Sequence, residues 1–249
     1  MNYKKNLKYL IYKFLNNFKF ITFMHIILVM VSIFINILLL NNNRYSIAND
    51  SVNLHEMELN FRSKEELNNV QIDDKVIGCT NAPHTIINYS SMSCPHCAEF
   101  MTKDFNLLKE KFIDTCKVRF VYREIPNNSA ALMTASIAHC FYIRHNNINT
   151  YFDIIKIFFR TQRSWAMRYD PESVKEIMLL NGYNKEDIDY CLGNKTYINY
   201  IIEHGYEYQK VMDIRFTPLS VIDGNVMSQN ISYDDINAII SKTAVKGAK

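Results

Sequence analysis

Hydrophobic and polar residues alternate with two different periods along the middle of the chain. Thr85 to Ser90 form a short apolar run, which predicts a buried strand. A second strand is expected at 117–123, with Val118, Phe120 and Tyr122 on one face. Between the two strands, apolar residues recur at spacings of three and four, which predicts an amphipathic helix with a stripe of Ala98, Met101, Phe105, Leu108 and Phe112. A strand, helix and strand in this order require parallel pairing through a right-handed crossover.

The next 90 residues have a helical period throughout, and we expect a group of helices from about 128 to 213. Cap and stop residues divide this stretch, because Asp170-Pro171 starts a helix, Asn181-Gly182 ends it and Asn184 starts the next one. After residue 216 the pattern changes to a loop and a hairpin with an Asp223-Gly224 turn. The last predicted helix runs from 233 to 241, and 244–249 are expected to form a frayed tail.

The beginning of the chain has a different composition. Residues 1–19 contain five lysines and no acidic residue, and 20–40 are largely apolar and long enough to span a bilayer. The lysine asymmetry places the N-terminus in the cytoplasm, so the remainder is expected to be exported. We favour an uncleaved membrane anchor over a cleaved signal, although Ser46-Ile47-Ala48 would serve as a cleavage site. A buried core helix is the plainer alternative, which the lysine asymmetry disfavours.

Residues 41–74 are polar, and we interpret them as a tether whose role is spacing, with one short helix near 63–67 started by a Ser63–Glu66 capping box. Residues 1–44 contain six basic residues and no acidic residue. The formal net charge of +3 for the whole chain therefore becomes −3 for residues 45–249. The basic charge is therefore a signal of membrane orientation and does not indicate nucleic-acid binding.

The chemistry is expected at Cys94-Pro95-His96-Cys97, between the first strand and its helix. Pro95 suits the first helical turn, where its missing N–H costs nothing. Free N–H groups and the macrodipole at the helix N-terminus favour a thiolate at Cys94, which lowers its pKa and makes a Cys94–Cys97 disulfide more oxidising. We expect Cys97 to be buried and to act as the resolving thiol, and His96 to be a further group that stabilises the thiolate.

Two other interpretations of this dithiol were weighed, a zinc site and a purely structural disulfide. Zinc usually needs four ligands, and the chain has no second C-x-x-C and no paired histidine cluster. No glycine-rich phosphate loop, Ser-His-Asp order or carboxylate pair stands out, and the chain contains only six glycines. We therefore expect a redox dithiol that requires no metal and no cofactor.

Together these motifs resemble the DsbA family of thiol:disulfide oxidoreductases. The family's active site is similar to Cys94-Pro95-His96-Cys97. The segment that leads into DsbA-like domains is similar to Val76-Ile77-Gly78 followed by Asn81-Ala82-Pro83. The family's cis-proline loop is similar to Thr217-Pro218. The resemblance covers residues 75–243. It implies an α/β protein, a thioredoxin fold with an inserted all-helical subdomain, preceded by the N-terminal transmembrane helix or signal sequence. It also implies a cis bond before Pro218 that exposes the Thr217 backbone to an extended substrate, whereas the residues alone also allow a trans proline that starts a strand.

Four cysteines remain outside the motif. Cys140 and Cys191 lie on apolar helix faces and form our preferred structural disulfide, while Cys79 and Cys116 precede neighbouring strands and form a second candidate pair. The plainer alternative is that each is a small buried hydrophobe. We interpret His139, His84 and His204 as packing or surface residues, and Trp165 as a core residue more than part of a substrate-facing surface.

The resemblance implies a membrane-tethered oxidase that faces the bacterial periplasm. Its partners would be unfolded or cysteine-containing exported proteins, a membrane protein that re-oxidises it, and the inner membrane through residues 20–40. An isomerase or reductase of the same fold is an alternative, although the tether is too short for a separate dimerisation domain. A metal-binding module or a non-enzymatic interaction scaffold is the other alternative.

Overall fold

The computed structural model describes residues 30, 32, 61–168, 170–227 and 231–246. The expected basic segment at 1–19 lies outside these residues, as do the first part of the tether and, apart from Met30 and Ser32, the expected membrane or signal segment at 20–40. Within the described ranges, no helix combines the length and apolar content that a membrane crossing requires. The folded domain belongs to a compact unit that spans Glu58–Lys249.

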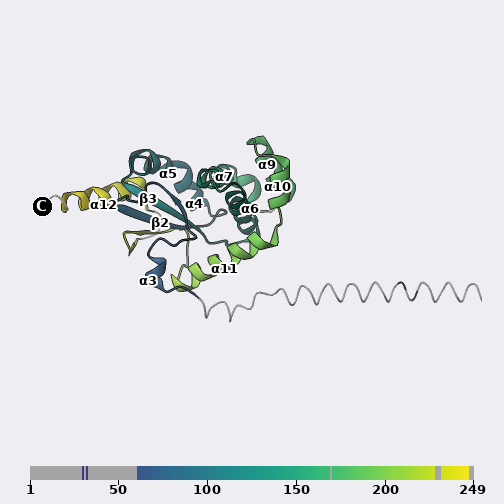
Figure 1. Cartoon of the computed structure of the whole chain (residues 1–249), viewed down its shortest axis with the longest axis horizontal. Helices are drawn as coiled ribbons and strands as arrows, with labels where there is room; N and C mark the ends of the chain where they lie inside the picture. Colours follow the sequence, from purple (N-terminus) through teal and green to yellow (C-terminus); the bar gives the residue numbers. More distant parts are fainter. Residues whose placement is uncertain (1–29, 31, 33–60, 169, 228–230, 247–249) are drawn as a thin grey trace, which may run out of the picture. The chain divides into compact units, whose positions relative to one another are not determined.

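A mixed five-stranded sheet forms the centre of this domain, in the order β1-β3-β2-β4-β5. Figure 1 labels the neighbouring strands β2 and β3. Its strands are β1 (Lys75–Ile77), β2 (His84–Ser90), β3 (Val118–Glu124), β4 (Leu219–Ile222) and β5 (Asn225–Val226). β2 and β3 pair in parallel, which confirms the expected crossover, and the other neighbouring pairs are antiparallel. Asp223 and Gly224 both have positive φ, as a two-residue hairpin turn between β4 and β5 requires.

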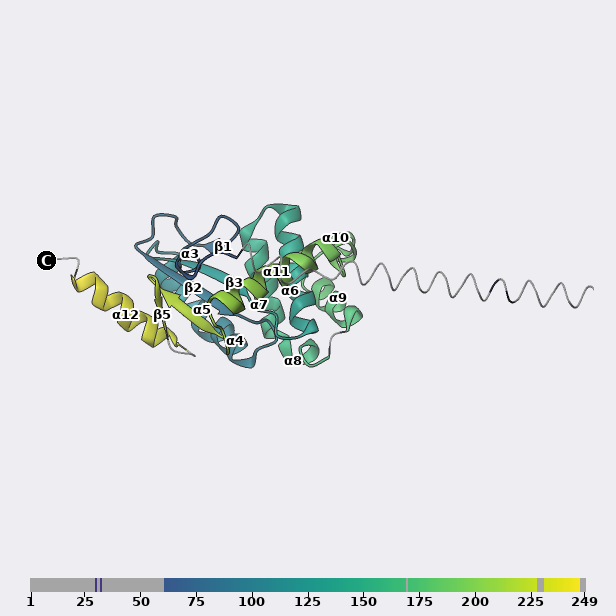
Figure 2. The same ribbon diagram turned by 90° about the horizontal axis from the view of Figure 1, so that it is seen from below.

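Between β3 and β4 the described chain is helical, which confirms the expected insertion. Its helices are α6 (Ser129–His145), α7 (Ile148–Arg160), α8 (Gln162–Trp165), α9 (Pro171–Leu180), α10 (Lys185–Cys191) and α11 (Lys195–Val211). Asp170 and Asn184 cap α9 and α10 through their side chains, as expected. In Figure 2, α9 and α10 lie at the end of the domain opposite α12 (Tyr233–Lys246).

The helix that follows the dithiol forms one continuous run, but its geometry changes along the way. α4 (Pro95–Glu99) leads into the π-helix η1 (Phe100–Asp104), then α5 (Phe105–Leu108) and a second π-helix, η2 (Lys109–Ile113). Met101, Phe105 and Leu108 of the predicted stripe are buried in the core, so the face was predicted correctly. The wider π turns were not expected, because spacings of three and four residues fit an α-helix.

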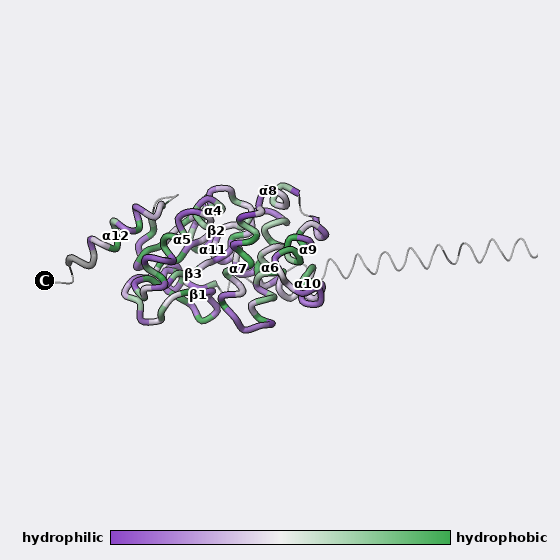
Figure 3. The backbone as a smooth tube through the Cα atoms, turned by 90° about the horizontal axis from the view of Figure 1, so that it is seen from above, coloured by the Kyte–Doolittle hydropathy of each residue, from purple (hydrophilic) through white to green (hydrophobic). Residues whose placement is uncertain are grey.

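Alternate residues of β3 enter two hydrophobic clusters, one on each face of the sheet. Val118, Phe120 and Tyr122 belong to the cluster that contains the helices from α4 to α10, which confirms that they share a face. Val121 of β3 and Ile87 of β2 belong to the other cluster, which contains residues of α3 and α11. Figure 3 shows hydrophobic and polar stretches alternating along the helices that cover the sheet. Both faces of the sheet are thus buried, which fixes the position of the strand ends that carry the site.

The last part of the expected tether is a component of the folded domain. Ser63 starts α3 (Lys64–Leu67) with the expected capping box, and Leu67 is fully buried. Asp74 forms an ion pair with Arg123 at 2.7 Å, with the two side chains 0% and 1% exposed. The interpretation of residues 61–74 as a spacer was therefore wrong, because their charges pair with partners distant in the sequence.

Two element boundaries also differ from expectation. Residues 75–77 were expected only as a lead-in, but they form β1 and pair with β3. The last helix, expected at 233–241, continues to Lys246 and so enters the expected tail. Residues 247–249 lie outside the described part of the chain.

Candidate active site

The dithiol lies where β2 meets the first helical turn, on the side of the sheet that carries α4. Cys94 is the N-cap residue of α4 and Pro95 occupies its first turn, as expected. The Cys94 side chain is 7% exposed and that of Cys97 is 0% exposed. Both thiols are free in the structure. A reaction partner therefore has access only to Cys94.

Hydrogen bonds at the helix N-terminus lower the pKa of Cys94 from 9.0 to about 5. The largest cause is the hydrogen bond from the Cys97 thiol, and burial opposes it. The Thr217 side chain and the backbone N–H groups of Cys97 and His96 also favour the thiolate. Cys94 is thus a thiolate at neutral pH, in agreement with the helix-terminus argument.

Cys97 behaves in the opposite way, since burial raises its pKa well above the usual value. The Cys94 thiol acts in the same direction through its hydrogen bond and its charge. The Ser90 side chain and the Ser91 backbone N–H, which lies 3.5 Å from Cys97 Sγ, lower the pKa but do not outweigh burial. Cys97 therefore stays a thiol at neutral pH and must take up a proton whenever it leaves a disulfide.

The loop before β4 lies directly opposite Cys94. The Thr217–Pro218 peptide bond is cis, as the resemblance implied. The Cys94 thiol donates a hydrogen bond to the backbone carbonyl oxygen of Thr217 at 3.3 Å. The structure therefore brings together Cys94, Cys97 and the Thr217-Pro218 loop, although 120 residues separate the loop from Cys97.

His96 was expected to be a further group that stabilises the Cys94 thiolate, and it does lower the pKa of Cys94. The structure shows an exposed His96 whose contribution to the low Cys94 pKa comes from its backbone N–H. Any residue except proline would supply that donor at this position.

Two side chains that the sequence analysis did not single out hold the active-site loop. Gln162 of α8 donates hydrogen bonds to the backbone oxygens of Met92 at 2.7 Å and Cys94 at 3.0 Å. Asn127 accepts hydrogen bonds from the hydroxyls of Ser91, at 3.0 Å, and Ser93. The helical insertion thus positions the dithiol directly, which sequence spacing alone does not reveal.

The sequence analysis did not single out Glu124, which is a buried acid next to the dithiol. It is 6% exposed and accepts hydrogen bonds from the Met92 backbone N–H at 3.1 Å and the Tyr122 hydroxyl at 2.6 Å. Burial, together with a smaller effect of the charge of Cys94, raises the pKa of Glu124 to about 8. Glu124 is therefore a proton carrier near neutral pH whose charge competes with that of the Cys94 thiolate.

The four remaining cysteines form the two disulfides that were considered. Cys140 of α6 is bonded to Cys191 of α10, and Cys79 is bonded to Cys116. Each pair closes a loop of the domain and is separate from the dithiol. The interpretation of these cysteines as isolated buried hydrophobes is therefore wrong.

The three histidines considered above, His84, His139 and His204, and Trp165 occupy structural positions in the described part of the chain. His84 and His204 pair with Asp223 and Asp73 at 2.8 and 2.7 Å. Trp165 is 1% exposed and its ring N–H donates to the Phe158 backbone oxygen, which confirms its core position. His139 is also buried, among aromatic rings. Across the described ranges, no group of three or more histidine, cysteine, aspartate or glutamate side chains is placed to hold a metal ion.

Comparison with known proteins shows the family and the fold to which this chain is similar. A family model described as thioredoxin matches residues 71–242. A Rickettsia typhi protein, named as a protein-disulfide oxidoreductase, is 27% identical over 81% of this chain and 73% of its own length. A Rickettsia bellii protein of the same name is 28% identical over 68% of this chain and 64% of its own length. The chain thus spans less than two thirds of the second relative.

The fold also matches a solved structure. The crystal structure of Wolbachia pipientis alpha-DsbA1 superposes with a TM-score of 0.68, covering 75% of this chain and all of that one. The sequences are 24% identical, so this likeness concerns the fold.

Proposed function

This chain belongs to the thioredoxin family as a DsbA-like thiol:disulfide oxidoreductase, and on that premise we propose that its Cys94–Cys97 disulfide is donated to exported proteins. The observation that carries the proposal is the asymmetry of the dithiol. Cys94 has a low pKa and the only accessible sulfur of the pair, whereas Cys97 is fully buried and has a high pKa. Stabilising the Cys94 thiolate favours the reduced form, so the disulfide is a strong oxidant.

The reaction proceeds by two thiol–disulfide exchanges. A substrate thiolate attacks Cys94 Sγ, the Cys94–Cys97 bond breaks, and Cys97 leaves as a thiolate that takes up a proton. A second substrate thiolate then attacks the substrate sulfur of the mixed disulfide, and Cys94 leaves as a stable thiolate. Two electrons pass from the substrate dithiol to the protein dithiol. One substrate proton replaces the one taken up by Cys97, and the other goes to the solvent.

The Thr217-Pro218 loop is well placed to hold the substrate during the first attack. Thr217 lies beside Cys94, and its carbonyl oxygen faces the reacting sulfur. An extended substrate segment that pairs with the Thr217 backbone would bring its cysteine to Cys94. The attack would then occur on the accessible sulfur and leave Cys97 as the leaving group.

The location of the protein is part of the proposal. Lysines before an apolar segment at 20–40 support a tether in the inner membrane, with residues 61–246 in the periplasm. Two further disulfides in the domain fit an oxidising compartment. A membrane protein that accepts two electrons from the reduced dithiol would then restore the disulfide. Labelling of an expressed full-length chain with a membrane-impermeant maleimide in intact spheroplasts would test this orientation.

Reduced, unfolded ribonuclease A is a suitable substrate for testing disulfide donation. The oxidised full-length chain should consume two substrate thiols per protein. Cys97→Ser, with Cys94 first converted to its mixed disulfide with thionitrobenzoate, should release thionitrobenzoate and form a mixed disulfide between Cys94 and the substrate. Cys94→Ser is the matched control that should do neither. Loss of substrate thiols without any requirement for Cys94 would contradict the proposal. Faster rearrangement of scrambled ribonuclease than oxidation of the reduced form would favour an isomerase.

A further inference from the structure

A cavity of about 560 Å³ lies beside the dithiol and is lined by residues of α4, η1, α7 and α8. Pro95, which follows Cys94 directly, forms part of its wall. Gln162 forms another part, and its side-chain amide donates to the backbone oxygen of Cys94 at 3.0 Å. The cavity therefore begins at the residues that hold the reactive cysteine in place.

The cis-proline loop is separate from this cavity, since neither Thr217 nor Pro218 lines it. The Cys94 sulfur faces the Thr217 carbonyl oxygen, whereas the cavity begins at Pro95. A polypeptide that reacts at Cys94 can thus contact the loop with one part and the cavity with another. The loop would hold the residues at the reacting sulfur, and the cavity would hold residues farther along the polypeptide.

The charged side chains at the cavity are mainly basic. Lys103, Arg160 and Arg163 line it together with one acidic residue, Glu99. Glu99 and Lys103 form an ion pair with each other at 2.7 Å. Arg160 and Arg163 are exposed, and within the described part of the chain neither has an ion pair. The cavity is therefore positive, although residues 45–249 have a formal net charge of −3.

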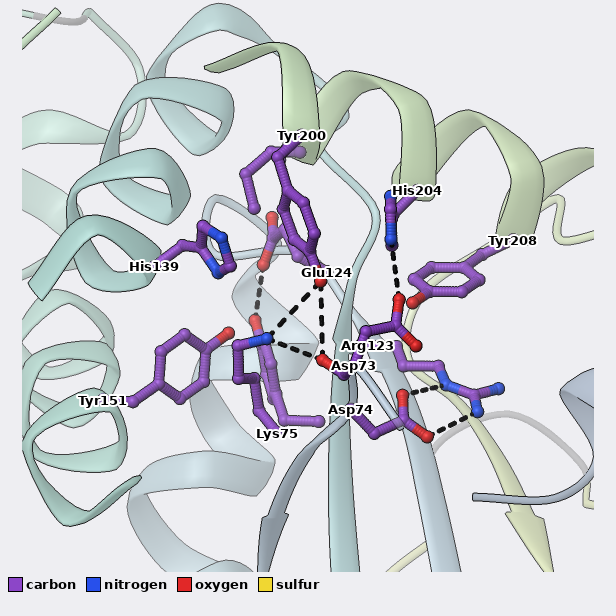
Figure 4. Close-up of a pocket in the computed structure, with 12 residues that line it drawn as sticks. Asp73, Asp74, Lys75, Arg123, Glu124, His139, Tyr151, Tyr200, His204 and Tyr208 are labelled. Carbon is purple, nitrogen blue, oxygen red and sulfur yellow. Dashed lines mark hydrogen bonds and ion pairs between the residues drawn. The ribbon is translucent and has the colours of Figure 1, made fainter. Parts of the chain in front are cut away.

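The small cavity behind Glu124 has the opposite arrangement of charges (Figure 4). Asp74 pairs there with Arg123 at 2.7 Å, and Asp73 pairs with His204 at 2.7 Å. That cavity measures about 30 Å³, which is room for one water molecule. The cavity beside Pro95 differs in both respects, since it has two arginines without a carboxylate partner and room for side chains of a second polypeptide.

The remaining lining residues suit the binding of side chains with an acidic tip. Pro95, Ala98 and Phe159 give the wall an apolar part, and Phe159 is 2% exposed. Each arginine presents a planar fork of N–H donors, which matches the two oxygens of a carboxylate. The apolar wall can contact the methylene groups of an aspartate or glutamate side chain while a guanidinium binds its carboxylate.

From this arrangement we infer that the cavity binds acidic residues that flank the reactive cysteine of the substrate. Arg160 and Arg163 would then select, among exported proteins, those with carboxylates near the reacting thiol. The inference rests on the proposed function, because the bound segment belongs to the polypeptide that reacts at Cys94. An extended segment advances about 3.4 Å per residue, so residues a few positions from the cysteine reach the cavity. The two arginines bind and orient the substrate, and the exchange of sulfur bonds is unchanged.

Such a site has a kinetic signature. Positive charges beside the reacting sulfur attract an anionic segment before any bond forms, which raises the second-order rate constant. Salt screens charges that are exposed to solvent, so the effect should weaken as ionic strength rises. A substrate segment with basic residues at the same positions should be repelled.

Two dithiol peptides of equal length test the selection, one with aspartates and one with lysines on both sides of the cysteines. The oxidised full-length chain is mixed with each peptide, and acid quench with thiol alkylation gives the rate of peptide oxidation. Each rate is divided by the rate of the same peptide with 2,2′-dithiodipyridine. This uncharged disulfide corrects for the effect of neighbouring charges on the peptide thiols.

The wild-type chain should prefer the acidic peptide about tenfold at low ionic strength, and the preference should shrink severalfold in about 1 M sodium chloride. Arg160→Gln combined with Arg163→Gln should remove most of the preference. Lys64→Gln combined with Lys117→Gln is the matched control, because it removes two exposed charges that do not line the cavity. This control should keep the wild-type preference.

Reversing the charge separates binding from a structural role of the two arginines. Arg160→Glu combined with Arg163→Glu should prefer the basic peptide, which a merely loosened site would not do. Equal corrected rates of the wild-type chain with both peptides would overturn the inference, and so would a preference for the acidic peptide that survives charge reversal. Failure of the wild-type chain to oxidise either peptide would instead count against the proposed function.

An anionic membrane surface is the other partner that exposed arginines could contact, and the same variants distinguish it. Equal rates with both peptides, together with binding to phosphatidylglycerol vesicles that requires Arg160 and Arg163, would assign these side chains to the membrane and overturn the inference. Selection between the peptides in the absence of vesicles would support the substrate site.

Discussion

The Cys94 thiol donates a hydrogen bond to the Thr217 carbonyl oxygen at 3.3 Å, across 123 residues of sequence. This contact joins the first turn of α4 to the loop before β4. The carbonyl oxygen can accept only from the protonated thiol, whereas the Thr217 side chain lowers the pKa of Cys94 and so favours the thiolate. One residue therefore contacts both states of the reactive sulfur.

Thr217→Val should raise the pKa of Cys94 above its value of about 5, because the variant loses the hydroxyl that stabilises the thiolate. Each unit of increase destabilises the thiolate by about 1.4 kcal/mol and lowers the redox potential by about 30 mV. The pH dependence of Cys94 alkylation by iodoacetamide measures the shift. Thr102→Val is the control, since its hydroxyl bonds only to backbone oxygens of its own helix. An unchanged Cys94 pKa in Thr217→Val would contradict this account of the site.

Glu124→Gln should change how stability depends on pH. The pKa of Glu124 is about 8 in the folded chain, against 4.5 in a model peptide, so the folded state binds more protons between these values. Its contribution to stability is therefore present below pH 4.5 and is lost as pH rises through 8, by a few kcal/mol. Because glutamine does not titrate at this position, the free energy of unfolding of Glu124→Gln should rise relative to that of the wild type as pH rises.

Urea unfolding of the reduced protein at pH 5 and pH 8 measures this difference. Glu110→Gln, on an exposed glutamate, is the matched control and should track wild type at both values. A constant difference between Glu124→Gln and wild type at the two pH values would mean that Glu124 does not titrate in this range.

Asp74→Asn should destabilise the domain by about 3–5 kcal/mol, because it leaves the buried Arg123 guanidinium without its partner charge. The exposed Asp213–Arg215 pair provides the comparison, and Asp213→Asn should cost at most about 1 kcal/mol. The urea midpoints of the two variants measure how much stability each one loses. Equal small losses would show that residues 61–74 contribute little to the fold.

Replacing both Cys140 and Cys191 with alanine should lower stability without changing the reactive dithiol. The disulfide joins residues 51 apart, and a cross-link of that span contributes about 4 kcal/mol by restricting the unfolded chain. Cys94 should keep its alkylation rate, because the pair lies between α6 and α10. Differential scanning calorimetry and the alkylation rate test both parts, and a slower or faster Cys94 would show that the pair influences the site.

Local patterns predicted much of the fold. The strand before Cys94, the cap at Asp170 and the Asp223-Gly224 turn each depend on residues near in sequence, and all three are present. The reactive dithiol was predicted for the same reason, since a helix N-terminus and two cysteines one turn apart are local features.

The features that the sequence did not reveal depend on tertiary contacts. Glu124 titrates near neutral pH only because the fold buries it, and Gln162 reaches the active-site loop from a helix 68 residues away from Cys94. Asp74 lies in the expected polar tether, and no local pattern indicates that Arg123 is its buried partner. A possible signal was the position of Glu124 directly before Ile125-Pro126, at the end of a strand whose other residues are apolar on one face.

The redox potential of the Cys94–Cys97 pair tests the central claim most directly. It would be measured on the protein with both structural disulfides intact, by equilibration with glutathione, acid quench and alkylation. A thiolate as stable as Cys94 predicts a strongly oxidising value, towards the roughly −120 mV of DsbA. A value near the roughly −270 mV of thioredoxin, about 7 kcal/mol away, would make the pair a reductant and contradict disulfide donation.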